Sequence, residues 1–230
     1  MVKPKVAIIT RARNRLEYTI RCINAVQKYA GYSNYEHIII SQDSTDGTVQ
    51  WLDWITNNLP SKWFSNVRPI HPKKNLGDFG GIIHGTKKTD APLIMQLDND
   101  IEITHPNWLS VLIQLFQEEK NYVAMMLKRE GIRTELTGKE HRVGIVDSKK
   151  YKMVRIGIVV ACFITRRESI LKFNARDNCR KLATLGQSLK ITNIKATHME
   201  GYNQDGKDSY LQITKYKRGE NNANNKHSVK

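Results

Sequence analysis

An apolar run that stops at two carboxylates is the strongest constraint on this chain of 230 residues. Residues 93–97 read Leu-Ile-Met-Gln-Leu, and Asp98 and Asp100 follow one residue apart. Such a run predicts a buried strand, so both carboxylates fall at its carboxyl end, the edge where open α/β sheets bind ligands. Two hard oxygen donors there suit Mg²⁺ or Mn²⁺ that also holds phosphate oxygens. The plain alternative is a strand that ends in a polar turn.

Strand and helix patterns alternate along the chain. Strands are predicted at residues 6–10, 37–41, 67–70, 93–97, 122–126, 158–164 and 191–194, of which 67–70 contains Pro69 and is expected at a sheet edge. Helices are predicted from Leu16, from Val49, after the Gly-rich turn 75–81, from Thr104 and over residues 176–185. This alternation predicts an α/β fold with a mostly parallel, twisted sheet flanked by helices. Residues 216–230 lack an apolar period, which predicts a disordered, basic tail after a single domain of residues 1–215.

The charge balance favours anionic partners. The chain has 37 Lys and Arg against 22 Asp and Glu, a formal net charge of +15. Nine of these bases fall between Lys128 and Arg155, against four acids. Such a segment is either a solvated loop or hairpin, or a surface that binds anions.

Compartment signals are few. Three cysteines, Cys22, Cys162 and Cys179, have no metal-ligand spacing and fit a reducing environment. The longest apolar run is too short for a transmembrane segment, and residues 1–5 show no secretory pattern. We therefore expect a cytoplasmic protein without a transmembrane segment, for which peripheral contact with a membrane stays open.

Ordered motifs carry a resemblance to a known family. They are Val6–Thr10 with Asn14-Arg15, Gln42-Asp-Ser-Thr-Asp-Gly-Thr48, Asn75-Leu-Gly77, Asp98-Asn-Asp100 and Pro106-Asn-Trp-Leu109. Together, over roughly residues 5–186, they resemble glycosyltransferase family 2. The resemblance implies a GT-A fold and transfer of a sugar from a nucleoside-diphosphate sugar. It implies a nucleotide-sugar-binding half at residues 1–105 and an acceptor half at residues 106–215.

The resemblance also implies roles on the donor side. Asp43 matches the family residue that accepts a hydrogen bond from a base N–H, which favours a UDP-sugar; its plain alternative is a helix cap. The other donor-binding candidates end a strand or shape the turn facing the diphosphate: Thr10, Arg11, Asn75, Gly77, Asp98 and Asn99. An Arg-Asn pair that the family often has further along is Ile82-Ile83 here. Arg11 or a residue of the basic segment 128–155 is therefore the candidate that replaces this pair at the diphosphate.

In the family, the second carboxylate of the Asp-x-Asp motif binds the metal through the diphosphate, and the first contacts sugar hydroxyls. A late histidine sometimes completes the metal shell. The metal candidates are accordingly Asp100, Asp98 and His198, for Mn²⁺ or Mg²⁺. The alternative for His198 is an ordinary surface histidine.

An inverting transfer needs a base, and the expected Glu-Asp pair falls on Asn174-Ala175, which are not acids. Asp177, two residues on, is the candidate base; its alternative is a carboxylate in the first turn of a helix. The missing pair also leaves open a non-catalytic protein that binds nucleotide sugars or nucleic acid.

Acceptor-binding candidates follow from the acceptor-side strand of the family and from the basic segment: Ala161, Arg166, Arg167, Lys149, Lys150 and Lys152. The expected acceptor is a polyanion. One candidate is DNA with a modified base flipped into the site, and the other is a lipid-linked or cell-surface glycan at an anionic membrane face.

Overall fold

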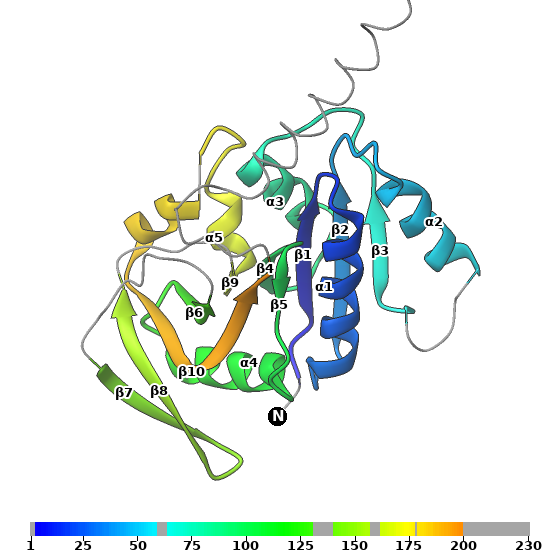
Figure 1. Cartoon of the computed structure of the whole chain (residues 1–230). Helices are drawn as coiled ribbons and strands as arrows, with labels where there is room; N and C mark the ends of the chain where they lie inside the picture. The colour runs from blue at the N-terminus through cyan, green and yellow to red at the C-terminus, as the bar shows by residue number, and fades with distance from the viewer. Residues whose placement is uncertain (1–2, 59–63, 131–139, 157–161, 178, 200–230) are drawn as a thin grey trace, which may run out of the picture.

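The computed structural model describes residues 3–58, 64–130, 140–156, 162–177 and 179–199 (Figure 1). The first half alternates β1 (Val6–Ala12), α1 (Leu16–Tyr29), β2 (Tyr35–Ser41), α2 (Thr48–Asn58), β3 (Val67–Ile70), α3 (Asp78–Thr86) and β4 (Leu93–Asp98). Then follow β5 (Ile101–Glu102), α4 (Trp108–Glu118), β6 (Ala124–Glu130), β7 (Glu140–Val146), β8 (Lys149–Ile156), β9 (Phe163–Arg166), α5 (Arg167–Leu171), the 3₁₀ helix η1 (Cys179–Leu185) and β10 (Ser188–His198). The expected tail 216–230 and Ala161 lie outside the described residues.

One sheet contains all these strands, in the order β3-β2-β1-β4-β9-β6-β10-β8-β7, with β5 paired to β10. Strands β1 to β4 are parallel, whereas β9 runs antiparallel to both β4 and β6. The expected α/β fold is thus confirmed, with a parallel first half and a mixed second half. A helix is expected over residues 176–185. The structure has a shorter 3₁₀ helix there, η1, at residues 179–185.

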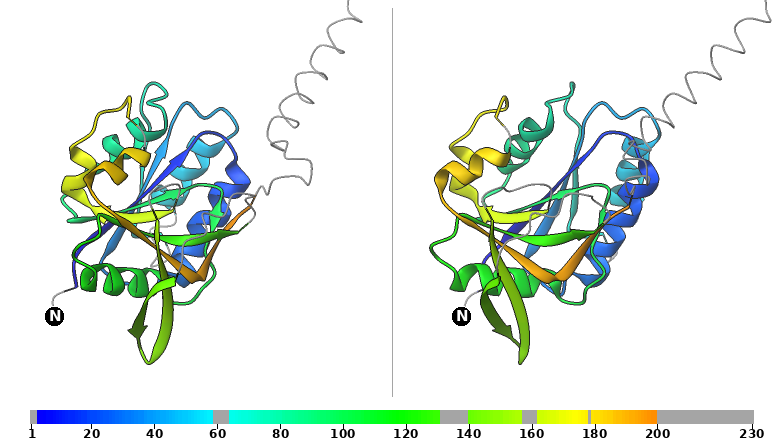
Figure 2. Two further views of the ribbon diagram at one scale, coloured as in Figure 1. Left: turned by 90° about the vertical axis from the view of Figure 1, so that its left-hand side faces the viewer. Right: turned by 60° about the vertical axis from the view of Figure 1, so that its left-hand side comes forward.

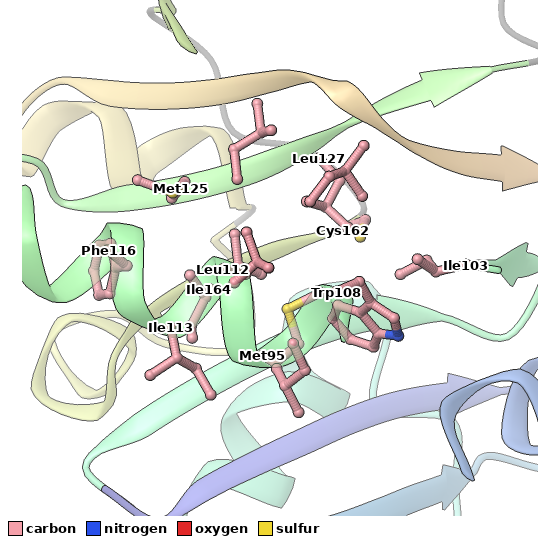
Figure 3. Close-up of a cluster of buried hydrophobic side chains, with 14 of the residues drawn as sticks. Met95, Ile103, Trp108, Leu112, Ile113, Phe116, Met125, Leu127, Cys162 and Ile164 are labelled. Carbon is pink, nitrogen blue, oxygen red and sulfur yellow. The ribbon is translucent and has the colours of Figure 1, made fainter. Parts of the chain in front are cut away.

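Helices cover both faces of the sheet, so β1 and β4 are buried on both sides (Figure 2). Ile8 and Met95 pack in the core cluster that includes α1 and α4, which also holds Trp108 (Figure 3). Their neighbours Ile9 and Ile94 pack against α3 on the other face. This alternation follows from the two-residue period of a strand. Among the described residues, no helix is both long and apolar enough to cross a bilayer.

The end of α1 fixes the start of α4. The carbonyl oxygen of Ala30 accepts the backbone N–H of Leu109 at 3.1 Å, which satisfies a donor that the first turn of α4 cannot pair internally. Gly31 has φ +62° and lies against Asn107. Asn107 is the residue before α4 and has φ 60°. Helix α4 therefore begins at Trp108, four residues after the predicted start at Thr104.

Gly31→Ala should destabilise the protein more than Gly47→Ala. Both glycines have positive φ, so each substitution meets a left-handed backbone at a cost of about 1–2 kcal/mol. A Cβ on Gly31 would also lie 2.5 Å from Asn107 Cα, whereas the nearest atom to one on Gly47 is at 3.7 Å. Overpacking adds about 1–3 kcal/mol, so urea unfolding should show a loss of about 2–5 kcal/mol for Gly31→Ala. Equal losses in the two variants would contradict this account of the α1–α4 junction.

Candidate functional site

A cleft of about 390 Å³ opens where β1 and β4 end. It is lined by Arg11, Arg13, Arg15, Gln42, Asn75, Gly77, Asp78, Asp98, Asn99 and Asp100. Parallel pairing of β1 with β4 sets Arg11 opposite Asp98, and the loop before α3 closes one wall. Sequence reasoning assigned eight residues to the donor and the Asp-x-Asp motif. Six of them meet here: Arg11, Asn75, Gly77, Asp98, Asn99 and Asp100.

Arg11 bridges two carboxylates inside this cleft. Its Nη2 donates to Asp98 Oδ1, and its Nη1 donates to Asp78 Oδ1 at 2.6 Å. Gln96 Nε2 also donates to Asp98 Oδ1, at 2.8 Å. Burial lowers the pKa of Arg11, but Asp98 and Asp78 raise it by more, so the guanidinium stays charged. These contacts hold Asp98 in one orientation, and the positive charge of Arg11 balances the negative charge of its carboxylate.

Asp100 forms the second charged cluster. Arg15 Nη1 donates to Asp100 Oδ2 at 2.8 Å, and His198 Nε2 lies 3.3 Å from the same oxygen. Burial raises the pKa of the Asp100 carboxyl, but His198 and Arg15 outweigh this effect and hold the pKa below its ordinary value. The structure thus brings His198, at the end of β10, beside the carboxylate with which sequence reasoning grouped it.

The donor set around Asp100 fits a divalent cation. Asp100 Oδ1 is buried and accepts no hydrogen bond within the described part of the chain, a state that costs free energy unless a ligand binds there. A carboxylate oxygen beside an imidazole nitrogen suits Mn²⁺. Within the described ranges, however, no three His, Cys, Asp or Glu side chains form a group able to hold a metal. Protein ligands alone would therefore leave the coordination shell incomplete, and phosphate oxygens are the natural complement.

A left-handed turn points Arg15 at Asp100. Asn14 and Arg15 have φ 59° and 64°, a conformation that non-glycine residues adopt at a cost. The turn is fixed from two sides: Asn14 Oδ1 accepts the N–H of Thr45 at 2.7 Å, and Asn99 Nδ2 donates to the Asn14 carbonyl at 3.3 Å. Asn99 Nδ2 also donates to Thr19 Oγ1 at 2.9 Å. Asn99 thus holds the wall of the cleft together through its side chain.

Gln42 holds the turn that faces the cleft. It is buried, its Oε1 accepts the N–H of Leu76 at 2.9 Å, and its Nε2 donates to the Gly77 carbonyl at 3.4 Å. Asn75 Oδ1 accepts the N–H of Gly77 at 2.9 Å, which closes the turn. Gln42 stands where the family motif has its first Asp. The replacement of Asp by Gln therefore provides an amide that holds the turn at Leu76 and Gly77.

Asp43 lies at the rim, one residue after Gln42. Its φ is 54° and its carboxylate is exposed, with Arg13 Nη2 at 3.9 Å. Thr10 is placed differently from the prediction, because it is fully buried and its Oγ1 lies 2.8 Å from His37 Nε2. Burial lowers the pKa of His37 to about 3, so this pair is neutral. The expectation that Thr10 faces the nucleotide is wrong, since its side chain points from β1 into the core.

Asp177 caps its own loop. Its Oδ2 accepts the N–H of Asn174 at 2.9 Å, and its Oδ1 pairs with Lys181 Nζ at 2.5 Å. The Asn174 N–H and then Lys181 lower the pKa of Asp177. The loop is nonetheless close to the cleft, since Ala175 packs beside Gly80 in the first turn of α3.

Arg166 and Arg167 lie at the opposite edge of the sheet, so their assignment to the acceptor face is wrong. Strand β9 is antiparallel to β4 and pairs Arg166 with Leu93, five residues or about 16 Å from Asp98. Arg166 Nη1 donates to the Tyr122 carbonyl at 3.0 Å, and Arg167 Nε donates to the Thr89 carbonyl at 2.9 Å. Both arginines therefore stabilise the amino edge of the sheet.

The three candidate lysines also lie away from the cleft. Lys149, Lys150 and Lys152 belong to β8, in the β7–β8 hairpin. In Figures 1 and 2 this hairpin projects downward beside α4, whereas β1 runs upward. The cleft lies at the carboxyl end of β1, away from the hairpin. The structure does not bring these lysines to the Asp-x-Asp motif.

Sequence reasoning missed four residues of the cleft: Arg13, Arg15, Gln42 and Asp78. The alternation Arg11-Ala-Arg13-Asn-Arg15 directly after a buried strand was a usable signal, because it collects cations at the ligand-binding edge. Ile82 and Ile83, at the places of the family's Arg-Asn pair, are buried against β1 and β2. Arg11 fills part of the adjoining space, since its Cδ lies 3.3 Å from where a Cβ on Gly81 would stand.

Comparison with known proteins identifies the fold and the family. A search of curated proteins by sequence found no match. Solved structures with a similar fold include S. aureus TarS 1-349 in complex with UDP-GlcNAc, with TM-score 0.59 and 15% identity over 85% of this chain and 60% of that chain. GalNAc-T7 with UDP, GalNAc and Mn²⁺ has TM-score 0.69 and 12% identity over 88% and 44% of the two chains. The mannosyltransferase PcManGT from Pyrobaculum calidifontis, with GDP-Man and Mn²⁺, has TM-score 0.64 and 10% identity over 88% and 59%.

This chain thus spans 44% to 60% of the length of these three structures. In sequence, residues 7–183 match the family described as Glycosyl transferase family 2. That match extends from β1 into η1 and includes all ten residues of the cleft. The chain therefore belongs to glycosyl transferase family 2 and has the GT-A fold.

Proposed function

We propose that this protein transfers a sugar from a nucleoside-diphosphate sugar, favouring a UDP-sugar, to an acceptor hydroxyl with inversion, and that it requires Mn²⁺ or Mg²⁺. The observation that carries the proposal is the cleft that Asp100 lines together with three arginines, with His198 beside the Asp100 carboxylate. The UDP-GlcNAc, UDP and GDP-Man of the similar structures, two of which hold Mn²⁺, support the donor class and the metal.

Several residues in and beside the cleft have a proposed task. Asp100 and His198 hold the cation, which when bound offsets the negative charge that grows on the leaving diphosphate. Asp98, oriented by Arg11, accepts hydrogen bonds from sugar hydroxyls. Asn75 and Gly77 shape the wall beside the diphosphate, and their turn is held by Gln42.

The proposed base is Asp177, on the family resemblance and on the position of its loop beside α3. Its two hydrogen-bonded partners lower its pKa, which weakens it as a proton acceptor. This observation favours a second candidate function, a protein that binds the nucleotide sugar without transferring it. A transfer assay with Mn²⁺ separates the two, because the binding protein would retain the donor intact. If transfer occurs but survives Asp177→Asn, then Asp78, a carboxylate that lines the cleft, is the next to test.

The proposed acceptor is anionic, in keeping with the net charge of +15, and nucleic acid is one such polymer. The β7–β8 hairpin supports the alternative of a glycan at an anionic membrane. Val143 and Ile145 are 51% and 58% exposed, and they pair across the hairpin with Lys152 and Lys150. Exposed aliphatic side chains beside lysines suit a lipid surface better than a phosphate backbone.

Asp100→Asn should abolish Mn²⁺-dependent UDP binding. Asparagine keeps the size of the side chain but removes the charged ligand. Isothermal calorimetry with UDP, with and without Mn²⁺, measures the effect. The matched control is Glu102→Gln, which removes a carboxylate two residues away that pairs with Arg21 outside the cleft. Metal-dependent binding retained in Asp100→Asn, or lost equally in Glu102→Gln, would remove Asp100 from the metal site.

Asp43 should set the preference for the nucleotide base. Its exposed carboxylate at the rim can accept an imide N–H, which uracil and thymine carry and adenine lacks. A hydrogen bond to a charged group contributes about 1.5–3 kcal/mol, so UDP should bind about tenfold or more tightly than ADP. Asp43→Ala should remove most of that difference in calorimetry. Equal affinities in the unmodified protein would exclude Asp43 from base recognition.

The hairpin should bind polyanions in a salt-dependent way. On duplex DNA, the log of the affinity should fall with the log of salt concentration with a slope of about −0.9 per phosphate contacted. Changing Lys149, Lys150 and Lys152 to Glu should weaken binding and flatten the slope, while UDP binding stays unchanged. Anionic phosphatidylserine vesicles measured alongside DNA identify the partner: preference for vesicles assigns the membrane glycan. Absence of binding to both at low salt defeats the anionic acceptor.

A further inference from the structure

We infer that the cleft exchanges ion pairs when it binds its donor: Arg15 neutralises Asp100 in the free protein and moves to the diphosphate once a divalent cation takes Asp100. The inference rests on the proposed function. It adds that metal and nucleotide depend on each other for tight binding, and it names the residue that couples them.

The first observation is that Asp100 already has a cationic partner. Arg15 Nη1 lies 2.8 Å from Asp100 Oδ2, and the two side chains are only 20% and 11% exposed. His198 Nε2 lies 3.3 Å from the same oxygen. A divalent cation at this carboxylate would stand close to the guanidinium, and like charges repel strongly in a partly buried site. Arg15 in this position therefore weakens the binding of a metal ion by itself.

The second observation is that the charges lining the cleft balance. Three arginines, Arg11, Arg13 and Arg15, face three aspartates, Asp78, Asp98 and Asp100. A divalent cation and a diphosphate carry opposite charges, so together they preserve this balance and separately they disturb it. Guanidinium groups bind phosphate oxygens in a bidentate way, which gives a displaced arginine a new partner in the same cleft.

The third observation is that the exchange requires only a side chain to move. The backbone of Arg15 is fixed in its left-handed turn by the contacts of Asn14 with Thr45 and Asn99. The guanidinium lies at the far end of four rotatable side-chain bonds and already lines the cleft. A rotation of this side chain can carry the guanidinium from Asp100 toward the proposed position of the diphosphate, beside the Asn75–Gly77 wall, without unfolding the turn.

The test is a calorimetric titration of Mn²⁺ with and without UDP. In the unmodified protein, UDP should raise the Mn²⁺ affinity about tenfold or more, within the usual range of coupling between sites. Arg15→Gln should bind Mn²⁺ alone about fivefold or more tightly than the unmodified protein does, and most of the UDP effect should disappear. Arg15→Lys should restore the weak Mn²⁺ affinity, because it restores the charge. The matched control is Arg21→Gln in α1, which breaks a 2.7 Å pair with Glu102 of β5 outside the cleft and should change neither constant.

The outcomes separate this inference from the proposed function. If the unmodified protein binds Mn²⁺ and UDP but Arg15→Gln leaves the Mn²⁺ affinity unchanged or weaker, the exchange is overturned and the proposed function stands. If the unmodified protein binds neither ligand, the proposed function fails and takes the exchange with it. A measurement on the unmodified protein covers the case in which Arg15→Gln does not fold. The Arg15 Nε–H resonance should shift when Mg²⁺ and UDP are added together, and an unmoved resonance overturns the exchange.

Discussion

The parallel pairing of β1 with β4 is the constraint on which the site depends. It sets Arg11 opposite Asp98, and it carries the loops that follow both strands to the same edge of the sheet. Alternate residues of each strand are buried on opposite faces, so a slip of one residue would move core side chains such as Ile8 and Met95 to the wrong face and disrupt the packing of both. The hydrophobic core thus fixes the register, and the register fixes which charged groups share the cleft.

Electrostatic neutrality is the second organising feature. Asp98 and Asp100 are each paired with an arginine, and the remaining cleft carboxylate, Asp78, shares Arg11. The carboxylates of Asp98 and Asp100 are partly buried and would be costly without counter-ions, so the arginines stabilise the cleft. The same pairs make ligand binding an exchange of partners, which connects the stability of the free protein to the chemistry we propose for it.

Local patterns predicted the elements well. The apolar run of residues 93–97 became β4, and the motif after it reached the cleft with its second carboxylate beside His198. Strand direction was not readable in the same way: Arg166 reached the amino edge because β9 runs antiparallel to β4. Thr10 turned into the core because side chains alternate along β1, which places Thr10 on the same face as Ile8. The ion pair between Asp100 and Arg15 was not predicted, because 85 residues separate the two along the chain.

A crystal structure of the protein with Mn²⁺ and UDP tests the central claim most directly. The account predicts the metal bound by Asp100 and His198, the diphosphate in the cleft between α3 and the end of β1, and the Arg15 guanidinium on a phosphate oxygen. A nucleotide bound elsewhere, or one bound in the cleft with no metal at Asp100 and with Arg15 still paired to it, would contradict the account.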